Sequence, residues 1–475
     1  MSTATHPTPE QTGASTKLRE TEAPPSPAGP LDAGEPIALP PALSLPRPAQ
    51  TLMFGLRPLS FNLEPHRRLG DVWQIRLLSR NEPFVMTSHP DHVKSLFKAD
   101  PADAPSLTGE SPLRPILGPN SVLTLVGERH MRERKLLLPA FHGKAVQQYV
   151  EKISEIAQRE IDRWPVGKPF ALAPRMQAVT LDVIMGGIFG IEGSPAPGTA
   201  EYALRETFRR LLRISTTLLW QLVELRNLGR TEPRGLMRAG LKLADVQLYR
   251  AIRARRASAG HDGAADVLSL LLAARDEDVQ PLSDEHVRDE LMSLVLAGHE
   301  TTANSLAWTF ERLLRSPEPY RRLRETVRAG DDEAEEYVEA TVYEGMRVRP
   351  VIPIVVRMVK RPWRLGRYTV PANTPVGISI VALHHRPDVY PRAREFHPER
   401  FLEGKPGTYT WIPFGGGIRR CLGASLAMAE QRVVLRAIAE RTDLAAPDPA
   451  PEGARQRNVT MIPSRGGRVL VERKH

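Results

Sequence analysis

The stretch Phe414-Gly-Gly-Gly-Ile-Arg-Arg-Cys421-Leu-Gly423 holds the only cysteine of a 475-residue chain. Its three successive glycines lack a Cβ atom, so the backbone can adopt positive φ and a flat ligand can approach it closely. A helix-like pattern begins at Ala424, which places the sulfur of Cys421 at a helix N-terminus. Unpaired N–H groups and the positive end of the helix dipole favour an anion at that position. The local pattern therefore predicts a stabilised thiolate in a glycine-rich loop.

These residues resemble the haem-binding loop of the cytochrome P-450 family, the haem-thiolate monooxygenases, whose pattern is Phe-x-x-Gly-x-Arg-x-Cys-x-Gly. Every fixed position of that pattern is filled. The resemblance implies that Cys421 is the axial ligand of the haem iron, that Phe414 shields its sulfur, and that Arg419 pairs with a haem propionate. Gly415 belongs to the same cofactor-binding loop. Thiolate ligation pushes electron density onto iron and favours O–O cleavage.

Length and composition limit the possible architectures and partners. A chain of 475 residues would suit two or three domains by length alone. The resemblance implies instead one large, mainly α unit with a small β region and a long central helix over the haem. One cysteine excludes an intrachain disulfide, which fits a reducing cytoplasm. The net charge of +10 is spread over 65 basic and 55 acidic residues, so we expect no nucleic-acid partner.

Residues 1–48 form a separate, proline-rich zone with many small and polar residues. Such a composition buries too little apolar surface to order itself, so it predicts a disordered segment over 1–48 and a haem-thiolate monooxygenase domain over 49–475. The zone contains neither a long apolar run nor a basic stretch followed by an apolar core. We therefore expect no membrane anchor and no secretory signal, as in the soluble, bacterial members of the family.

Short β-branched runs indicate the small β region. Val72–Leu78 and Pro83–Thr87 predict two strands joined by a polar turn, and 351–359 and 376–381 are also strand-like. Helical periodicity dominates most of the chain from about residue 145 to 440.

The longest predicted helix runs from Ser283 to about Arg315, with Ser283 as N-cap and Pro317 ending the pattern. Within it lies the segment Ala297-Gly-His-Glu-Thr-Thr302. By itself the segment indicates only threonines that bond to carbonyls one turn earlier. It also resembles the family's oxygen-activation motif, which implies that Thr301 hydrogen-bonds dioxygen and that Glu300 helps to relay protons to it.

Two further segments carry charged pairs at helical spacing. Glu344 and Arg347 stand at i and i+3, and the resemblance implies that they form a buried structural triad with Arg400. His130 and Arg134 stand at i and i+4 on one helix face, which taken alone indicates a solvated basic surface. The resemblance implies that these two residues and Arg357 bind the haem propionates.

The resemblance implies a monooxygenase with haem b that inserts one atom of O2 into a lipophilic small organic substrate. Pocket residues by analogy include Ala297, Val351 and Ile354. Two alternatives stay open: a peroxide-driven peroxygenase or decarboxylase on the same fold, and a haem-binding sensor without turnover. The presence of both Glu300 and Thr301 favours the monooxygenase over either.

Electrons are expected from separate proteins, because no flavin or ferredoxin domain is visible after Cys421. The expected partners are a ferredoxin and a ferredoxin reductase that draw on NAD(P)H. Small ferredoxins are generally acidic, so basic residues near the cysteine are the expected docking surface. These residues are Arg132, Lys135, Arg420, Arg432 and Arg436.

Overall fold

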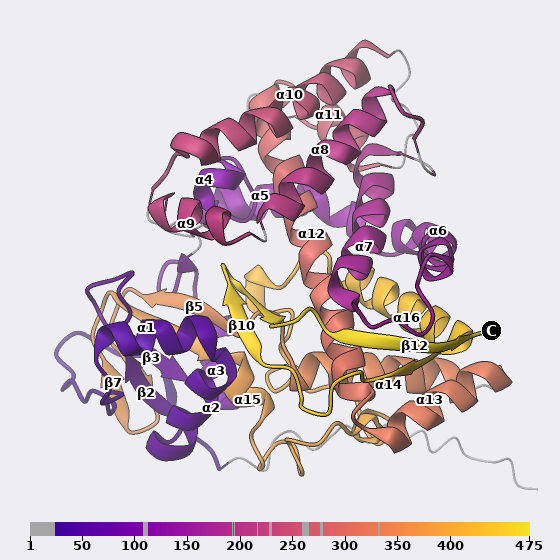
Figure 1. Cartoon of the computed structure of the whole chain (residues 1–475). Helices are drawn as coiled ribbons and strands as arrows, with labels where there is room; N and C mark the ends of the chain where they lie inside the picture. Colours follow the sequence, from indigo (N-terminus) through magenta and orange to yellow (C-terminus); the bar gives the residue numbers. More distant parts are fainter. Residues whose placement is uncertain are drawn as a thin grey trace, which may run out of the picture.

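The computed structural model describes residues 24–107, 113–191, 193, 195–215, 217–227, 230–258, 266–275, 279–330 and 333–475. A large helical part and a smaller part rich in strands lie side by side, and helix α12 (Asp284–Leu313) runs through the centre of the helical part (Figure 1). This is the mainly α architecture with a small β region that the sequence predicted.

The described residues form fifteen further α-helices. They are α1 (Arg47–Leu56), α2 (Pro58–Leu69), α3 (Pro90–Lys98), α4 (Arg114–Leu117), α5 (Gly127–Leu137), α6 (Lys144–Asp162), α7 (Leu172–Phe189), α8 (Ala200–Ser215), α9 (Leu218–Asn227), α10 (Gly235–Ala257), α11 (Val267–Ala273), α13 (Pro317–Ala329), α14 (Glu333–Val348), α15 (Ile380–His384) and α16 (Ala424–Arg441). Short 3-10 helices include η2 (Leu138–Phe141), η3 (Pro398–Phe401) and η4 (Gly417–Arg419).

The strands form four small sheets. The largest has the order β2-β3-β8-β5, with β3 and β8 parallel and the other pairs antiparallel. The others have the orders β1-β6-β7, β4-β12-β9 and β10-β11. The strands are β1 (Ala28–Pro30), β2 (Val72–Ile75), β3 (Phe84–Thr87), β4 (Phe170–Ala171), β5 (Ile354–Val359), β6 (Trp363–Leu365), β7 (Tyr368–Val370), β8 (Thr374–Ser379), β9 (Thr442–Ala445), β10 (Ala454–Arg457), β11 (Thr460–Pro463) and β12 (Arg468–Lys474).

Helix α12 is capped as its sequence predicted and is buried along most of its length. The side chain of Ser283 accepts a hydrogen bond from the N–H of His286 at 3.2 Å. Helix α7 packs so closely against α12 that a Cβ at Gly298 would overlap the side chain of Ile184. The Thr180 hydroxyl of α7 also donates to the carbonyl of His299 at 2.7 Å. The mid-helix glycine is therefore explained by close helix packing.

The ordered N-terminal chain begins earlier than predicted. Residues 1–23 lie outside the described residues, but β1 pairs antiparallel with β6, and residue 42 bridges to Gln74. The carbonyls of Pro40 and Pro41 accept hydrogen bonds from the side chain and the backbone N–H of Gln74 at 2.6 and 2.8 Å. The prediction of disorder is therefore wrong for residues 24–48, because proline lacks an N–H but keeps a carbonyl that can pair.

None of the described helices combines the length and apolarity that a membrane span requires.

Candidate functional site

The loop that carries Cys421 is fixed by a backbone hydrogen bond and by glycine conformations. The N–H of Cys421 donates to the carbonyl of Phe414 at 2.9 Å. Gly415 and Gly417 adopt φ of 65° and 63°, in the left-handed region that favours glycine. A Cβ at Gly416 would overlap the ring of Phe97, whereas a Cβ at Gly415 would meet no atom within 4 Å. The loop thus packs on α3 at one side and leaves accessible space at the other.

Cys421 is surrounded by protein, yet its side chain is accessible. Burial is the largest effect on the thiol and raises its pKa, while the backbone N–H of Gly423 and the charges of Arg134 and Arg420 act in the opposite direction. The favourable helix N-terminus that the sequence predicted is present, since α16 begins at Ala424. The preference for a thiolate at this helix N-terminus stays a prediction. A bound metal ion would deprotonate a coordinating thiol outright.

Four basic side chains from three separate segments converge near this loop. His130 and Arg134 lie on α5, Arg357 lies on β5, and Arg419 belongs to the cysteine loop. The pKa of His130 is lowered to about 4 by burial and by the positive charges of Arg419, Arg134 and Arg357. Burial lowers the pKa of Arg357 to about 10, and burial together with Arg357 and Arg134 lowers that of Arg419 to about 10. The structure therefore brings all four predicted propionate-binding residues together.

Neutral groups hold these cations in place. Arg419 donates to the carbonyls of Val122, at 3.2 Å, and Leu125. Arg357 donates to the carbonyl of Gly416 at 3.4 Å and stacks over the ring of Phe97, 5.4 Å from its centroid. Sequence reasoning did not find these contacts, because carbonyls and apolar rings carry no local signal of a binding role.

The residues present fit a dianionic cofactor with an iron centre. Within the described residues, no carboxylate forms an ion pair with Arg134, Arg357 or Arg419. The Nδ1 atom of His130 is buried without a hydrogen-bond partner. A pair of carboxylates, such as the propionates of haem, could bind the three guanidinium groups, which repel one another, and the unpaired imidazole nitrogen. The exposed sulfur of Cys421 is of the kind that would ligate the iron of such a cofactor.

One face of α12 is accessible in the middle of the molecule. Ala297 is exposed, and Gly298, Glu300 and Thr301 are partly exposed, although the flanking turns of the helix are buried. The hydroxyl of Thr301 donates to the carbonyl of Ala297 at 2.7 Å. The local interpretation, a threonine bonded one turn back, is thus correct for Thr301. The same hydroxyl also lies on the accessible face.

The carboxylate of Glu300 is held by the C-terminal hairpin β10-β11. Its Oε2 lies 3.0 Å from a guanidinium nitrogen of Arg457, and its Oε1 accepts a hydrogen bond from the hydroxyl of Thr460 at 3.1 Å. Arg457 is largely buried, with 8% of its side chain exposed, so the pair is shielded from solvent. No local pattern in the sequence indicates these two partners, which belong to a strand pair far along the chain.

The charged triad predicted behind the site is confirmed. Arg347 forms two hydrogen bonds of 2.7 Å with the Glu344 carboxylate, and Arg400 Nε lies 3.2 Å from the same group. Both Glu344 and Arg347 are fully buried. Arg347 also donates to the backbone carbonyls of His384, Ala393 and Glu395. The triad joins α14 to η3, and Arg347 also fixes the loop before η3.

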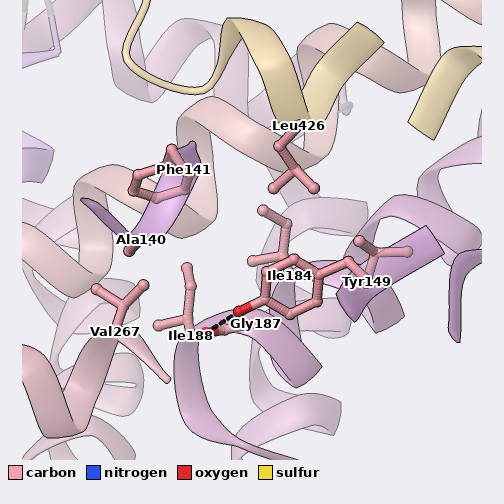
Figure 2. Close-up of a pocket in the computed structure, with 9 residues that line it drawn as sticks. Ala140, Phe141, Tyr149, Ile184, Gly187, Ile188, Val267 and Leu426 are labelled. Carbon is pink, nitrogen blue, oxygen red and sulfur yellow. Dashed lines mark hydrogen bonds between the residues drawn. The ribbon is translucent and has the colours of Figure 1, made fainter. Parts of the chain in front are cut away.

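The three residues proposed for a substrate pocket differ in their surroundings. Ala297 is exposed and Ile354 is partly exposed, whereas Val351 packs in a core cluster that includes Trp308 and Met461. A separate apolar cavity lies between η2, α6, α7, α11 and α16, and Tyr149, Ile184 and Leu426 are among the residues that line it (Figure 2). Its volume of about 10 Å³ matches a single water molecule at most, so it cannot hold an organic substrate.

Comparison with known proteins identifies the family of this fold and site. The family model for cytochrome P-450 matches residues 41–470. Among curated relatives, putative cytochrome P-450 137 of Mycobacterium tuberculosis is 38% identical over 85% of this chain and 83% of its own length. Putative cytochrome P-450 135A1 of the same species is 34% identical over 92% of this chain and 96% of its own length.

A solved structure has the same fold. The retinoic acid-bound cyanobacterial CYP120A1 aligns with a TM-score of 0.77 at 24% identity, over 93% of this chain and all of that chain.

Proposed function

Because the chain belongs to the cytochrome P-450 family of haem monooxygenases, we propose that Cys421 is the axial ligand of haem b and that four basic side chains bind its propionates. One observation carries this proposal: an accessible lone thiol lies beside His130, Arg134, Arg357 and Arg419, which have no acidic partner among the described residues. Phe414 and Gly415 complete the loop, with Phe414 next to the ring of Trp411 at 6.0 Å. Haem, when bound there, supplies dioxygen activation.

Glu300 and Thr301 are proposed to deliver protons at the accessible face of α12. Successive residues of an α-helix point about 100° apart, so Glu300 faces the hairpin while Thr301 faces the site. The Thr301 hydroxyl is a donor that can turn from the carbonyl of Ala297 toward a bound oxygen atom. The Glu300 carboxylate must move from Arg457 and Thr460 to pass a proton to that face. Arg457 is thus a positioning residue for Glu300.

The substrate is proposed to be a lipophilic small organic molecule. The accessible surface of α12 and β5 is largely apolar at Ala297, Ile354 and Val355, and apolar walls with few polar groups select such ligands. We assign Val351 a packing role next to this surface, because it is buried in a core cluster.

Electrons are proposed to come from an acidic ferredoxin and its reductase, with NAD(P)H as the source. Arg132 and Lys135 on α5 and Arg420 beside Cys421 are exposed and form the proposed docking surface. Arg432 and Arg436 no longer belong to it, because they form ion pairs with Glu339 and Glu335 of α14. We also propose a cytoplasmic location, in keeping with the single cysteine and the reducing environment.

Reconstitution with separate redox proteins tests this function. The haem-loaded protein is first screened with lipophilic compounds for the low-to-high-spin shift of the haem spectrum, and a responding compound is then supplied with ferredoxin, reductase and NADPH. We expect a hydroxylated or epoxidised product that requires all three components. Product formed only with added peroxide would favour the peroxygenase, and binding without any product would favour the sensor.

Charge reversal tests the docking surface separately. Lys135→Glu and Arg420→Glu should slow ferredoxin-dependent reduction at low salt while leaving the spin shift unchanged, because exposed charges act over about 30 Å at 0.01 M salt. Arg250→Glu, at an exposed arginine of α10, is the matched control. Equal rates for all three variants would contradict the assignment.

A further inference from the structure

A second polar cluster lies outside the residues assigned above, where α5 meets the first turns of α12. It consists of Glu133 on α5 and of His286 and Glu290 on α12. His286 and Glu290 stand at i and i+4, so they project from one face of the helix. Nothing in the proposed monooxygenase function uses these three side chains, and the inference drawn from them does not depend on it.

Each of the three side chains offers one possible metal-ligand atom, and these three atoms lie close together. A nitrogen of His286 and one carboxylate oxygen from each glutamate all lie within 4.8 Å of one another. Glu290 is 0% exposed and Glu133 is 8% exposed, so both carboxylates are buried. The side chain of His286 is 16% exposed and is the least buried of the three. Glu290 Oε1 is already engaged, because it accepts the N–H of Val122 at 2.7 Å. The other oxygen, Oε2, is buried without a hydrogen-bond partner.

One polar atom of each of the three side chains lacks a hydrogen bond. Glu133 Oε2, His286 Nε2 and Glu290 Oε2 are all buried without a hydrogen-bond partner. His286 Nε2 lies 3.1 Å from Glu133 Oε2, but the two groups do not have hydrogen-bond geometry. Unpartnered buried polar atoms are rare and costly, and three of them in one place need an explanation.

We propose that Glu133, His286 and Glu290 bind one divalent transition-metal cation of the zinc type. Imidazole nitrogen and carboxylate oxygen are ligands that Zn²⁺ takes at about 2.0 to 2.2 Å, which sets tetrahedral ligand atoms about 3.3 Å apart. The 3.1 Å separation of His286 and Glu133 meets this requirement. The Glu290 oxygen lies within 4.8 Å of the other two ligand atoms, so it must move closer to them when a cation binds. Two carboxylates and a neutral imidazole would balance the charge of the cation.

A proton in place of the cation explains the cluster less well. Burial and the charge of Glu133 raise the pKa of Glu290 well above its ordinary value. A protonated Glu290 should donate to Glu133 or His286, yet its Oε2 bonds to neither. A cation satisfies all three atoms together.

The position of the cluster indicates a structural role. Glu290 binds the N–H of Val122, and the carbonyl of Val122 accepts from Arg419. Glu133 precedes Arg134 on α5. A cation that joins α5 to α12 would therefore stabilise the segments that hold the basic cluster of the first site.

Zinc retention by the haem-loaded protein tests the proposal. The protein is treated with a chelator, desalted, incubated with Zn²⁺ and desalted again, and bound zinc is measured by mass spectrometry. We expect one zinc per chain in the wild type and at least about tenfold weaker binding by titration calorimetry in His286→Ala and Glu290→Gln. His142→Ala removes an exposed histidine outside the cluster and is the matched control. It should bind zinc as the wild type does.

The haem spectrum reports whether each variant is folded. His286 is only partly buried, so His286→Ala decides the test if Glu290→Gln does not fold. A wild-type protein that retains no more zinc than His286→Ala would overturn the proposal. Equal zinc binding by all variants would also overturn it, because the metal would then bind elsewhere.

Discussion

Removing the charge of Glu344 should destabilise the fold far more than removing an equivalent charge at the surface. In Glu344→Gln, the buried guanidinium groups of Arg347 and Arg400 lose the one carboxylate with which they pair among the described residues. Breaking a buried ion pair by removing one partner costs about 3 to 5 kcal/mol. Arg347 keeps three backbone carbonyls as acceptors, which favours the lower end of that range. A domain of ordinary stability has about 5 to 15 kcal/mol in total, so the loss is large.

Glu339→Gln is the matched control for this experiment. Glu339 lies on the same helix and pairs with Arg432 at 2.9 Å, but more than a third of each side chain is exposed. Exposed ion pairs contribute about 0 to 1 kcal/mol. Urea unfolding, followed by circular dichroism, should show a loss of about 3 kcal/mol for Glu344→Gln. A loss below about 1 kcal/mol, or equal losses for the two variants, would refute the reasoning.

Three further changes test separate parts of the structure. Thr301→Ala should keep the substrate-induced spin shift but divert NADPH electrons into hydrogen peroxide, and full coupling to product would exclude Thr301 from proton delivery. Burial raises the pKa of Glu430 to about 8, so the folded chain keeps a proton that the unfolded chain releases above about pH 4.5. Stability should therefore fall by up to about 1.4 kcal/mol per pH unit between these values, and urea unfolding of Glu430→Gln at several pH values should lack this slope. Gln50→Ala should lower the unfolding free energy by about 1 to 3 kcal/mol. The buried side chain of Gln50 donates to the carbonyls of Leu43 and Leu45 and accepts from the N–H of Arg76. An unchanged unfolding free energy would show that residues 43–45 add no stability.

Local sequence patterns correctly predicted helix caps and strand pairs that depend on neighbouring residues. The N-cap at Ser283 and the hairpin of β2 and β3 follow from neighbouring residues, and the structure contains both. The positions of Arg357 and Arg419 came from resemblance to a family, since nothing near either residue in the sequence indicates that they approach α5.

Contacts between segments that are distant in the chain were not predicted from the sequence. Arg457 and Thr460 reach Glu300 only because the hairpin β10-β11 folds back onto α12. Arg432 and Arg436 seemed available for docking until α14 placed acidic partners beside them. The pKa of the Cys421 thiol also depends on the packing around it. Each of these outcomes is decided by tertiary packing, which one chain segment does not encode alone.

The identity of the axial ligand tests the central claim most directly. The reduced, carbon monoxide-bound protein should show the red-shifted Soret band of a thiolate-ligated haem. Cys421→His should retain some haem but lose that band, because imidazole is a weaker electron donor than thiolate. A red-shifted band that persists in Cys421→His would contradict the assignment of Cys421 and the account of the site built on it.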